Sequence, residues 1–304
     1  MQIAILVLIS VLPALFLLWF FEKQDHGEKE PIRLKNKVFF WGVFSTIIAG
    51  GIEINVDSWI PESFNFWVYI FIMSFITTAL VEEGIKLWIV KKVAWPHKKF
   101  NEVMDGITYA VIAGLGFAML ENLLFVLSTN IEVGIARGLL AVPAHALFSG
   151  LLGYYIGEAK FQNTPWDARN KLWKGFLIAV FYHGLYDFLL FSQTSLWILI
   201  LPLLVIMAFH LTHLISKARH LDKHHKKNPR LFRLHIGIRI IAATAMTAAG
   251  VLSLSGTILA VYKGMPGYTY LEILYSAIFA LIMLTISYLL IRKGALKRGL
   301  QKKK

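Results

Sequence analysis

Long apolar runs separated by short polar loops dominate the pattern along the chain. Several of these runs approach the length of about 20 residues that an α-helix needs to cross a bilayer. They predict nine membrane-spanning helices, over 2–21, 37–53, 66–92, 104–128, 133–157, 173–191, 194–215, 235–262 and 269–291. The predicted fold class is therefore all-α, a polytopic transmembrane helical bundle.

Positive charge alternates between the loops that join these predicted helices. Lys and Arg are numerous after the first, third, fifth and seventh helices, and they are absent or nearly absent after the second, fourth, sixth and eighth. Cytoplasmic loops are enriched in Lys and Arg, so this alternation predicts an N-terminus outside and a C-terminus in the cytoplasm.

Composition agrees with a membrane protein. Of the 304 residues, 57% are hydrophobic and 16% charged, which is too apolar for a soluble domain. The net charge of +13 would suggest nucleic acid in a soluble protein. Here it lies in loops beside the predicted helices, where topology and anionic lipid headgroups account for it, so no nucleic-acid partner is expected. Cysteine is absent, which excludes disulfides and thiolate metal sites.

The chain divides into three predicted parts. Residues 1–65 hold N-terminal spans, residues 66–192 hold a catalytic core of four spans, and residues 193–304 hold C-terminal spans with a basic cytoplasmic loop and tail. The basic stretch at 210–230 carries five of the ten histidines. We interpret it as an amphipathic helix that touches anionic lipid, not as a catalytic segment.

The third predicted span contains Glu82, Glu83 and Lys86 in the stretch LVEEGIKLW. Each ionised residue at the centre of a membrane helix costs about 2.5–3.5 kcal/mol on insertion scales. Spacings of three and four residues place the lysine beside both carboxylates on one side of a helix. A structural ion pair would explain one glutamate and the lysine, whereas the second glutamate indicates a functional site.

The fourth predicted span carries a stripe of mostly small residues that ends at an acid. Gly106, Ala110, Gly114, Phe117 and Glu121 recur at steps of three and four. Small residues let a neighbouring helix approach closely, so the stripe predicts helix packing that delivers Glu121 to the contact. Asn122 follows about 100° further around the helix.

The fifth and sixth predicted spans add imidazoles. His145 and Ser149 share one face in VPAHALFSG, and His183 and Asp187 share one face in FYHGLYDF. Arg137, near the outer end of its span, is interpreted as an interfacial anchor. Counted from the predicted helix ends, the acids and imidazoles of four consecutive spans fall near the middle of the bilayer, so we expect one buried polar site.

The motifs EEGIK, FAMLEN, HALFSG and HGLYD occur in this order on the four spans. In this set the chain resembles the PrsW family of bacterial intramembrane proteases, which is distantly similar to the CAAX-prenyl endopeptidase family. It departs from the prenyl-endopeptidase pattern at two positions. Glu121 stands where a histidine is expected, and Lys86 replaces an arginine one residue later.

The resemblance implies hydrolysis of peptide bonds within the bacterial cytoplasmic (inner) membrane. The substrate class that it implies is a membrane-anchored regulatory protein such as an anti-sigma factor. For this chemistry Glu82, assisted by Glu83, is the candidate base, and Lys86 would hold their orientation. His145 and His183 could bind a metal ion with Glu121 or Asp187, in the open three-ligand arrangement that catalytic zinc uses.

Two alternatives stay open at this point. Without metal, a glutamate and an imidazole would activate water directly, while His145, Asn122 or Ser149 would stabilise the oxyanion. A proton- or cation-coupled transporter would also place acids, His and Lys at the midplane. The chain shows no inverted repeat of the kind that many transporters carry.

Overall fold

The computed structural model describes residues 2–24, 29–61, 63–129 and 131–222, together with Ala277 and Leu281. Within these ranges every regular element is a helix, as the sequence predicts. The chain divides into two compact units, Met1–His225 and Lys226–Lys304, and nearly all described residues belong to the first. The predicted functional divisions at 65/66 and 192/193 stay predictions.

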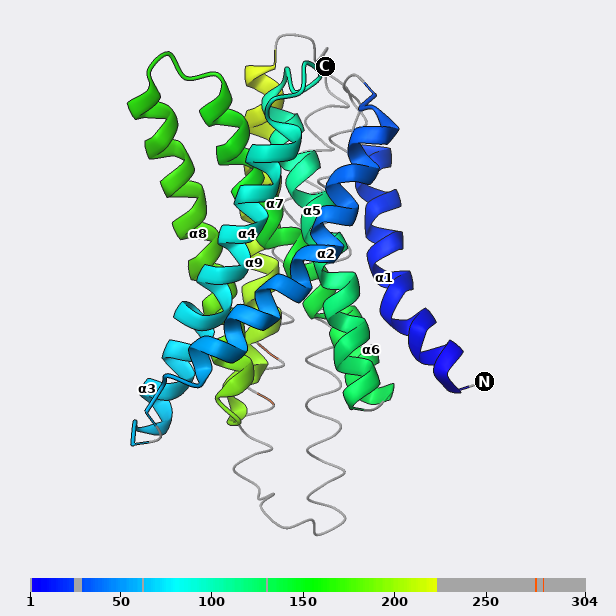
Figure 1. Cartoon of the computed structure of the whole chain (residues 1–304), viewed down its shortest axis with the longest axis vertical. Coiled ribbons are helices and arrows are strands. Elements are labelled where there is room, and N and C mark those ends of the chain that lie inside the picture. Colours follow the sequence, from blue (N-terminus) through cyan, green and yellow to red (C-terminus); the bar gives the residue numbers. More distant parts are fainter. Residues whose placement is uncertain are drawn as a thin grey trace. The chain divides into compact units, whose positions relative to one another are not determined.

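The first unit is a bundle of α-helices interrupted by short π- and 3₁₀-helical segments (Figure 1). Its elements are α1 (Gln2–Gln24), α2 (Ile32–Asp57), α3 (Phe66–Phe71), the π-helix η1 (Ile72–Ala79), α4 (Leu80–Ile89), the π-helix η2 (Val90–Ala94), α5 (Val103–Ser128), α6 (Ile131–Leu139), α7 (Ala141–Lys160), α8 (Pro165–Phe191), the 3₁₀-helix η3 (Ser195–Leu199) and α9 (Ile200–Leu221).

Six helical segments of the described chain are long and apolar enough to cross a membrane, and they correspond to the second through seventh predicted spans. The apolar part of α1, Leu6–Phe21, is shorter. The predicted span 235–262 lies outside the described residues, as does 269–291 apart from Ala277 and Leu281. Residues 223–230 of the basic stretch also lie outside them. The count of nine spans and the orientation of the termini therefore stay predictions.

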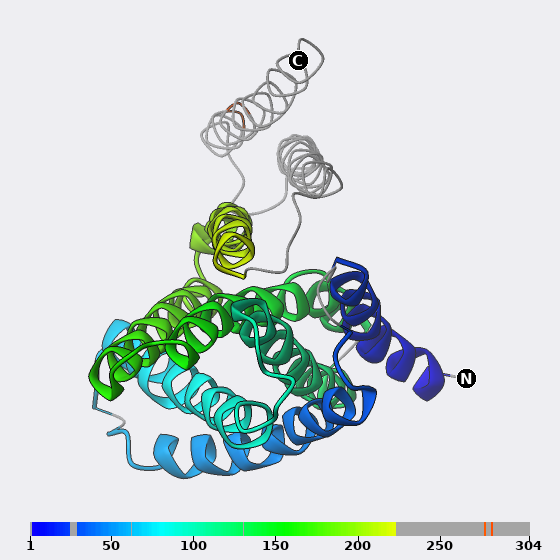
Figure 2. The same cartoon turned by 90° about the horizontal axis from the view of Figure 1, so that it is seen from above.

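Helices α5 and α7 pack closely at the centre of this unit, against each other and against α2 and α8 (Figure 2). Gly106 of α5 lies against the backbone of Gly153 and Gly157 of α7, where a Cβ atom would overlap main-chain atoms. Further along, Gly114 faces the side chain of Ser149. The small-residue stripe therefore packs against α7 along its length, as expected.

Replacing Gly106 with alanine is expected to destabilise the bundle by about 1–3 kcal/mol, because the added methyl group has no room beside α7. The matched control is Gly51→Ala on α2, where nothing lies within 4 Å of the new Cβ. Thermal denaturation in detergent should show a lower midpoint for the first variant only. Equal midpoints would mean that the two backbones are not in close contact.

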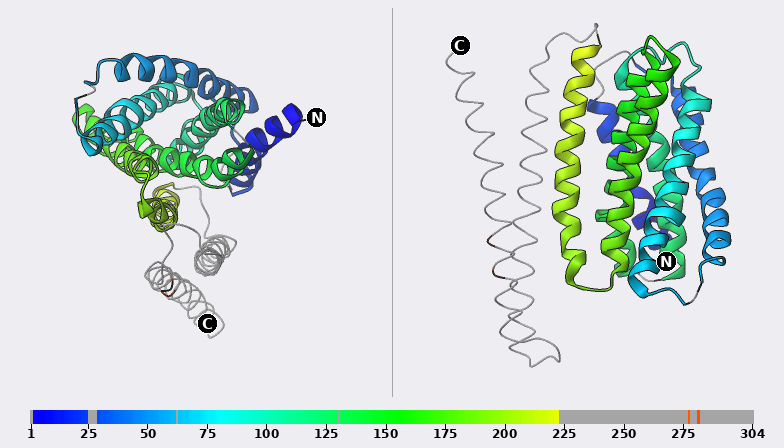
Figure 3. Two further views of the ribbon diagram at one scale, coloured as in Figure 1. Left: turned by 90° about the horizontal axis from the view of Figure 1, so that it is seen from below. Right: turned by 90° about the vertical axis from the view of Figure 1, so that its left-hand side faces the viewer.

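The π-helical segments η1 and η2 stand on either side of α4, where the sequence pattern predicts one continuous α-helix. A π turn holds one more residue than an α turn, so it changes which face of the following helix points inward. η1 packs against α8 (Figure 3), with Phe75 filling the space above Gly184. Because η1 precedes α4, this π segment and its packing on α8 determine which side chains of α4 point inward.

Asp222, at the end of α9, joins that helix to the start of α5. Its Oδ1 accepts from the backbone N–H of Val103 at 2.7 Å, and its Oδ2 accepts from that of Met104 at 3.1 Å. The first N–H groups of a helix have no partner within the helix, so an acid from another element stabilises this end. These two hydrogen bonds hold the end of α9 against the start of α5.

Candidate active site

Four helices bring the predicted polar residues together in the interior of the bundle. The side chains come from α4, α5, α7 and α8, and they are Glu82, Glu83, Lys86, Glu121, His145, His183 and Asp187. All but Glu121 are buried. The convergence expected from the sequence is therefore present in the structure, while the chemical role of each residue is a separate question.

Lys86 lies at the centre of this cluster and is fully buried. Its Nζ donates to Glu82 Oε2 at 3.0 Å and to Glu83 Oε1 at 2.8 Å. Nζ also lies 3.1 Å from His145 Nδ1, and 4.5 Å from the ring centroid of Phe117. Three polar partners and an aromatic face replace the water that the ammonium loses on burial, which explains how these charges are tolerated.

His183 is oriented by Glu83 and by an aromatic ring. Its Nδ1 lies 2.9 Å from Glu83 Oε1, and its ring stacks on Phe148 with centroids 4.5 Å apart and planes 13° apart. A carboxylate accepts hydrogen bonds, so Nδ1 carries the proton, and in the neutral ring Nε2 presents a lone pair. That Nε2 lies 3.9 Å from Glu82 Oε2 and 3.4 Å from Asp187 Oδ2.

The contacts of His145 favour the opposite tautomer from that of His183. An ammonium group can only donate, so the contact with Lys86 requires a lone pair on Nδ1 and places the proton of the neutral ring on Nε2. That Nε2 lies 2.8 Å from Glu121 Oε2. The Nδ1 lone pair lies 3.8 Å from Glu82 Oε2.

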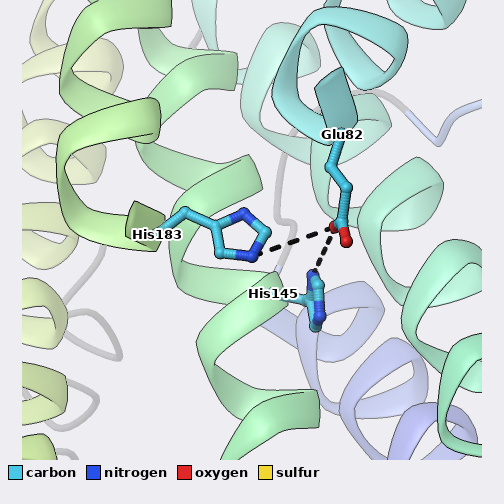
Figure 4. A group of neighbouring side chains, drawn as sticks. All are labelled: Glu82, His145 and His183. Carbon is cyan, nitrogen blue, oxygen red and sulfur yellow. Dashed lines mark ion pairs between the residues drawn. The ribbon is translucent and has the colours of Figure 1, made fainter. Parts of the chain in front are cut away.

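Two imidazole lone pairs therefore converge on one carboxylate (Figure 4). We call Glu82, His145 and His183 the Glu–His–His trio. Each contributes one donor atom, and these atoms all lie within 4.8 Å of one another. Behind the trio, Glu83 contacts the second nitrogen of His183 and Glu121 contacts that of His145. Carboxylates in this position fix the tautomer of metal-binding histidines.

The trio could hold a divalent ion if its donor atoms, now within 4.8 Å of one another, moved closer together. A tetrahedral zinc ion with bonds of about 2.1 Å sets its ligands about 3.4 Å apart, slightly closer than the separations of 3.8 and 3.9 Å found here. Lys86 Nζ contacts both Glu82 and His145, so it would have to withdraw toward Glu83 when an ion binds.

Arg137 belongs to this cluster, a contact that its interpretation as an interfacial anchor did not predict. It lies on α6, a separate helix before α7, and its Nη2 is 2.8 Å from Glu121 Oε1. The sequence places it near the end of an apolar run, where a charge normally meets the headgroups. The break between α6 and α7 at Leu140 instead allows it to reach α5.

No hydrogen bond joins Asn122 or Ser149 to the trio among the described residues. Asn122 Nδ2 donates to the backbone carbonyl of Ser10 on α1 at 3.4 Å, and Ser149 Oγ lies against Gly114. Asn122 Oδ1 and Ser149 Oγ are buried without a hydrogen-bond partner among the described residues. Their role as oxyanion stabilisers stays a prediction, and no contact of either residue with the trio supports it.

The sequence interpretation missed Glu53. This residue of α2 interacts electrostatically with Glu82, Glu121, His183 and Asp187, and its Oε1 is buried without a partner among the described residues. The predicted second span, 37–53, ends at this residue. Helix α2 continues to Asp57, which leaves Glu53 inside the apolar segment. The sequence signal that could have identified Glu53 is an acidic residue in the otherwise uncharged stretch GGIEIN.

Comparison with known proteins matches this chain to one family. A family model described as PrsW family intramembrane metalloprotease matches residues 30–214, which include every residue of the cluster. Proteins named Protease PrsW are similar to the chain. That of Clostridioides difficile is 31% identical over 73% of this chain and 93% of its own length, and that of Bacillus subtilis is 31% identical over 69% and 94%. That of Geobacillus kaustophilus is 36% identical over 62% and 80%. No solved structure matches.

Proposed function

The chain belongs to the PrsW family of intramembrane metalloproteases, and from this premise we propose that the Glu–His–His trio is its metal-binding active site. We further propose that it cleaves a membrane-anchored regulatory protein, such as an anti-sigma factor, in the bacterial cytoplasmic membrane. A proton- or cation-coupled transporter is not favoured, because the family is one of proteases.

The observation that carries the proposal is the orientation of the two histidines. Their lone pairs face Glu82 Oε2 at 3.8 and 3.9 Å, while a carboxylate contacts the other nitrogen of each ring. Catalytic zinc sites use three protein ligands and leave one position open. Sites of this kind also support their histidines with a second layer of carboxylates.

The balance of charge also supports a bound cation. The cluster combines the carboxylates of Glu82, Glu83, Glu121 and Asp187 with the fixed cations of Lys86 and Arg137. With Glu53 as a fifth carboxylate nearby, acids outnumber the fixed cations in an environment of low dielectric constant, where unbalanced charge is costly. A divalent ion would offset part of this excess.

A divalent ion held by the trio would act as a Lewis acid that polarises the scissile carbonyl. Because Glu82 would be a ligand of this ion, we assign the proton transfers to Asp187 and not to Glu82, the base that the sequence predicts. Asp187 Oδ2 is buried without a hydrogen-bond partner among the described residues and lies 3.4 Å from His183 Nε2, beside the trio. There it takes a proton from the attacking water and returns one to the leaving amine. Lys86 holds Glu83 in place.

In the alternative mechanism no metal takes part. Glu82 then accepts the proton of water directly, with Glu83 and Lys86 as its fixed neighbours. Both mechanisms need Glu82, so only metal content and the Asp187 variant separate them.

Purified protein is expected to hold about one divalent ion per chain and to cleave a tagged single-span substrate in vesicles. His145→Ala and His183→Ala should lose both ion and cleavage. Asp187→Asn should keep the ion and lower kcat by about 10²–10⁴-fold. The control is His213→Ala, which removes an exposed histidine on α9. Elemental analysis and cleavage assays measure these outcomes, and cleavage by metal-free protein would establish the alternative instead.

A further inference from the structure

Arg137 stands at the end of a line of charged contacts that leads into the candidate site. Its Nη2 lies 2.8 Å from one oxygen of Glu121, and the other oxygen lies 2.8 Å from His145 Nε2. A single carboxylate thus contacts a guanidinium on one side and an imidazole on the other. Neither Arg137 nor this bridge takes part in the proposed chemistry directly.

The packing of α6 and one aromatic ring set the position of the guanidinium. Gly134 of α6 lies against Val126, and Gly138 lies against Pro13, so α6 is in close contact with both α5 and α1. The guanidinium carbon of Arg137 lies 3.8 Å from the ring centroid of Phe125, one turn beyond Glu121 on α5. The ring and the carboxylate together hold the planar group in one orientation.

Glu121 occupies the accessible edge of an otherwise enclosed cluster. Its side chain is 18% exposed, whereas the side chain of His145 is 5% exposed. A carboxylate at such an edge can rotate away to be solvated, and Arg137 opposes this rotation through a charge-assisted contact. The arginine therefore keeps an acceptor beside His145 Nε2.

We propose that Arg137 is a positioning residue, which holds Glu121 against His145 and so keeps the proton of the imidazole on Nε2. The Nδ1 lone pair then faces Glu82, where the trio needs it. Without this support the ring can rotate, which breaks its contact with Lys86 at Nδ1; the proton can then sit on Nδ1, and the trio loses one of its donors. The catalytic consequence rests on the proposed function, whereas the tautomer of His145 does not.

The tautomer can be read in full-length protein by ¹⁵N NMR after selective labelling of histidine, with His145→Gln to identify its signals. Wild-type protein should show His145 protonated on Nε2 only. Arg137→Gln should give a mixture of both neutral tautomers, and Arg137→Lys, which keeps the charge, should restore part of the Nε2 form. The control is Arg169→Gln, which also removes an arginine stacked on an aromatic ring, at 4.4 Å from Trp166, away from this site.

Enzyme kinetics test whether Arg137 acts on His145 through Glu121. Arg137→Gln is expected to lower kcat about 10- to 100-fold with KM for the tagged substrate unchanged, as for other residues that support a ligand. Glu121→Gln should have an effect at least as large. The double variant should be no slower than Glu121→Gln alone, because both changes act on the same imidazole.

Two results would overturn the proposal. One is a His145 tautomer that is the same in Arg137→Gln as in wild-type protein. The other is a double variant whose loss in kcat is the product of the two single losses, since this would mean independent action. If wild-type protein cleaves no membrane-anchored substrate, the proposed function fails, and the NMR result still decides the role of Arg137.

Discussion

Replacing Glu82 with glutamine is expected to abolish cleavage, with kcat lowered by about 10²–10⁴-fold or more. The change keeps the size of the side chain but removes the negative charge toward which both imidazole lone pairs point. The loss follows whether Glu82 holds an ion or accepts a proton from water. Single-turnover cleavage of a tagged single-span substrate in vesicles measures it, free of any change in substrate binding.

The control for this experiment is Glu158→Gln. Glu158 is also a nearly buried glutamate paired with a lysine, with Lys171 Nζ at 2.8 Å from its Oε2, but it lies toward the other end of α7 from His145. Its replacement should leave the cleavage rate within a few-fold of wild type. Retention of cleavage by Glu82→Gln, in protein that is folded by thermal denaturation, would remove this residue from the mechanism.

Replacing Lys86 with methionine is expected to lower the free energy of unfolding by about 3–5 kcal/mol, because it leaves two buried carboxylates without their shared cation. The side chain is similar in size, so the loss of charge and not of packing volume dominates the effect. The midpoint of thermal denaturation in detergent should fall accordingly, and the double variant Lys86→Met with Glu83→Gln should recover part of it.

A matched ion pair at the edge of the bundle provides the comparison. Lys171 Nζ lies 2.8 Å from Glu158 Oε2, the same distance as Lys86 from Glu83, but the lysine side chain is 33% exposed. Solvent screens such a pair, so Lys171→Met should cost at most about 1 kcal/mol. Equal decreases in the denaturation midpoint for Lys86→Met and Lys171→Met would show that burial does not determine how much the Lys86 ion pairs stabilise the fold.

Several features of the fold and site could be predicted from local sequence. Apolar runs of sufficient length predict helices, and six of the predicted spans are helices long and apolar enough to cross a membrane. Ionisable residues inside such runs are costly, so Glu82, His145 and His183 stand out without any knowledge of contacts. Spacings of three and four residues also place Lys86 beside Glu82 and Glu83, as the structure has it.

Other features depend on how the helices rotate and approach one another, which no local pattern encodes. The π segments beside α4 interrupt a helix that the apolar pattern predicts as continuous. Arg137 and Glu53 lie near helix ends in the sequence, but the break before α7 and the length of α2 bring them to the cluster. Asn122 is the reverse case: it follows Glu121 on the same helix, but its side chain donates a hydrogen bond to α1.

The amino-acid sequence by itself therefore determined which residues are helical, which helices carry charge in an apolar segment, and the resemblance to intramembrane proteases. Only the tertiary structure decided which nitrogen of each imidazole faces Glu82, and that Glu121 contacts His145 from the side away from Glu82. The physical reason is one of range. Helix formation and burial cost depend on neighbours within a few turns, whereas donor geometry depends on atoms brought together from four different helices.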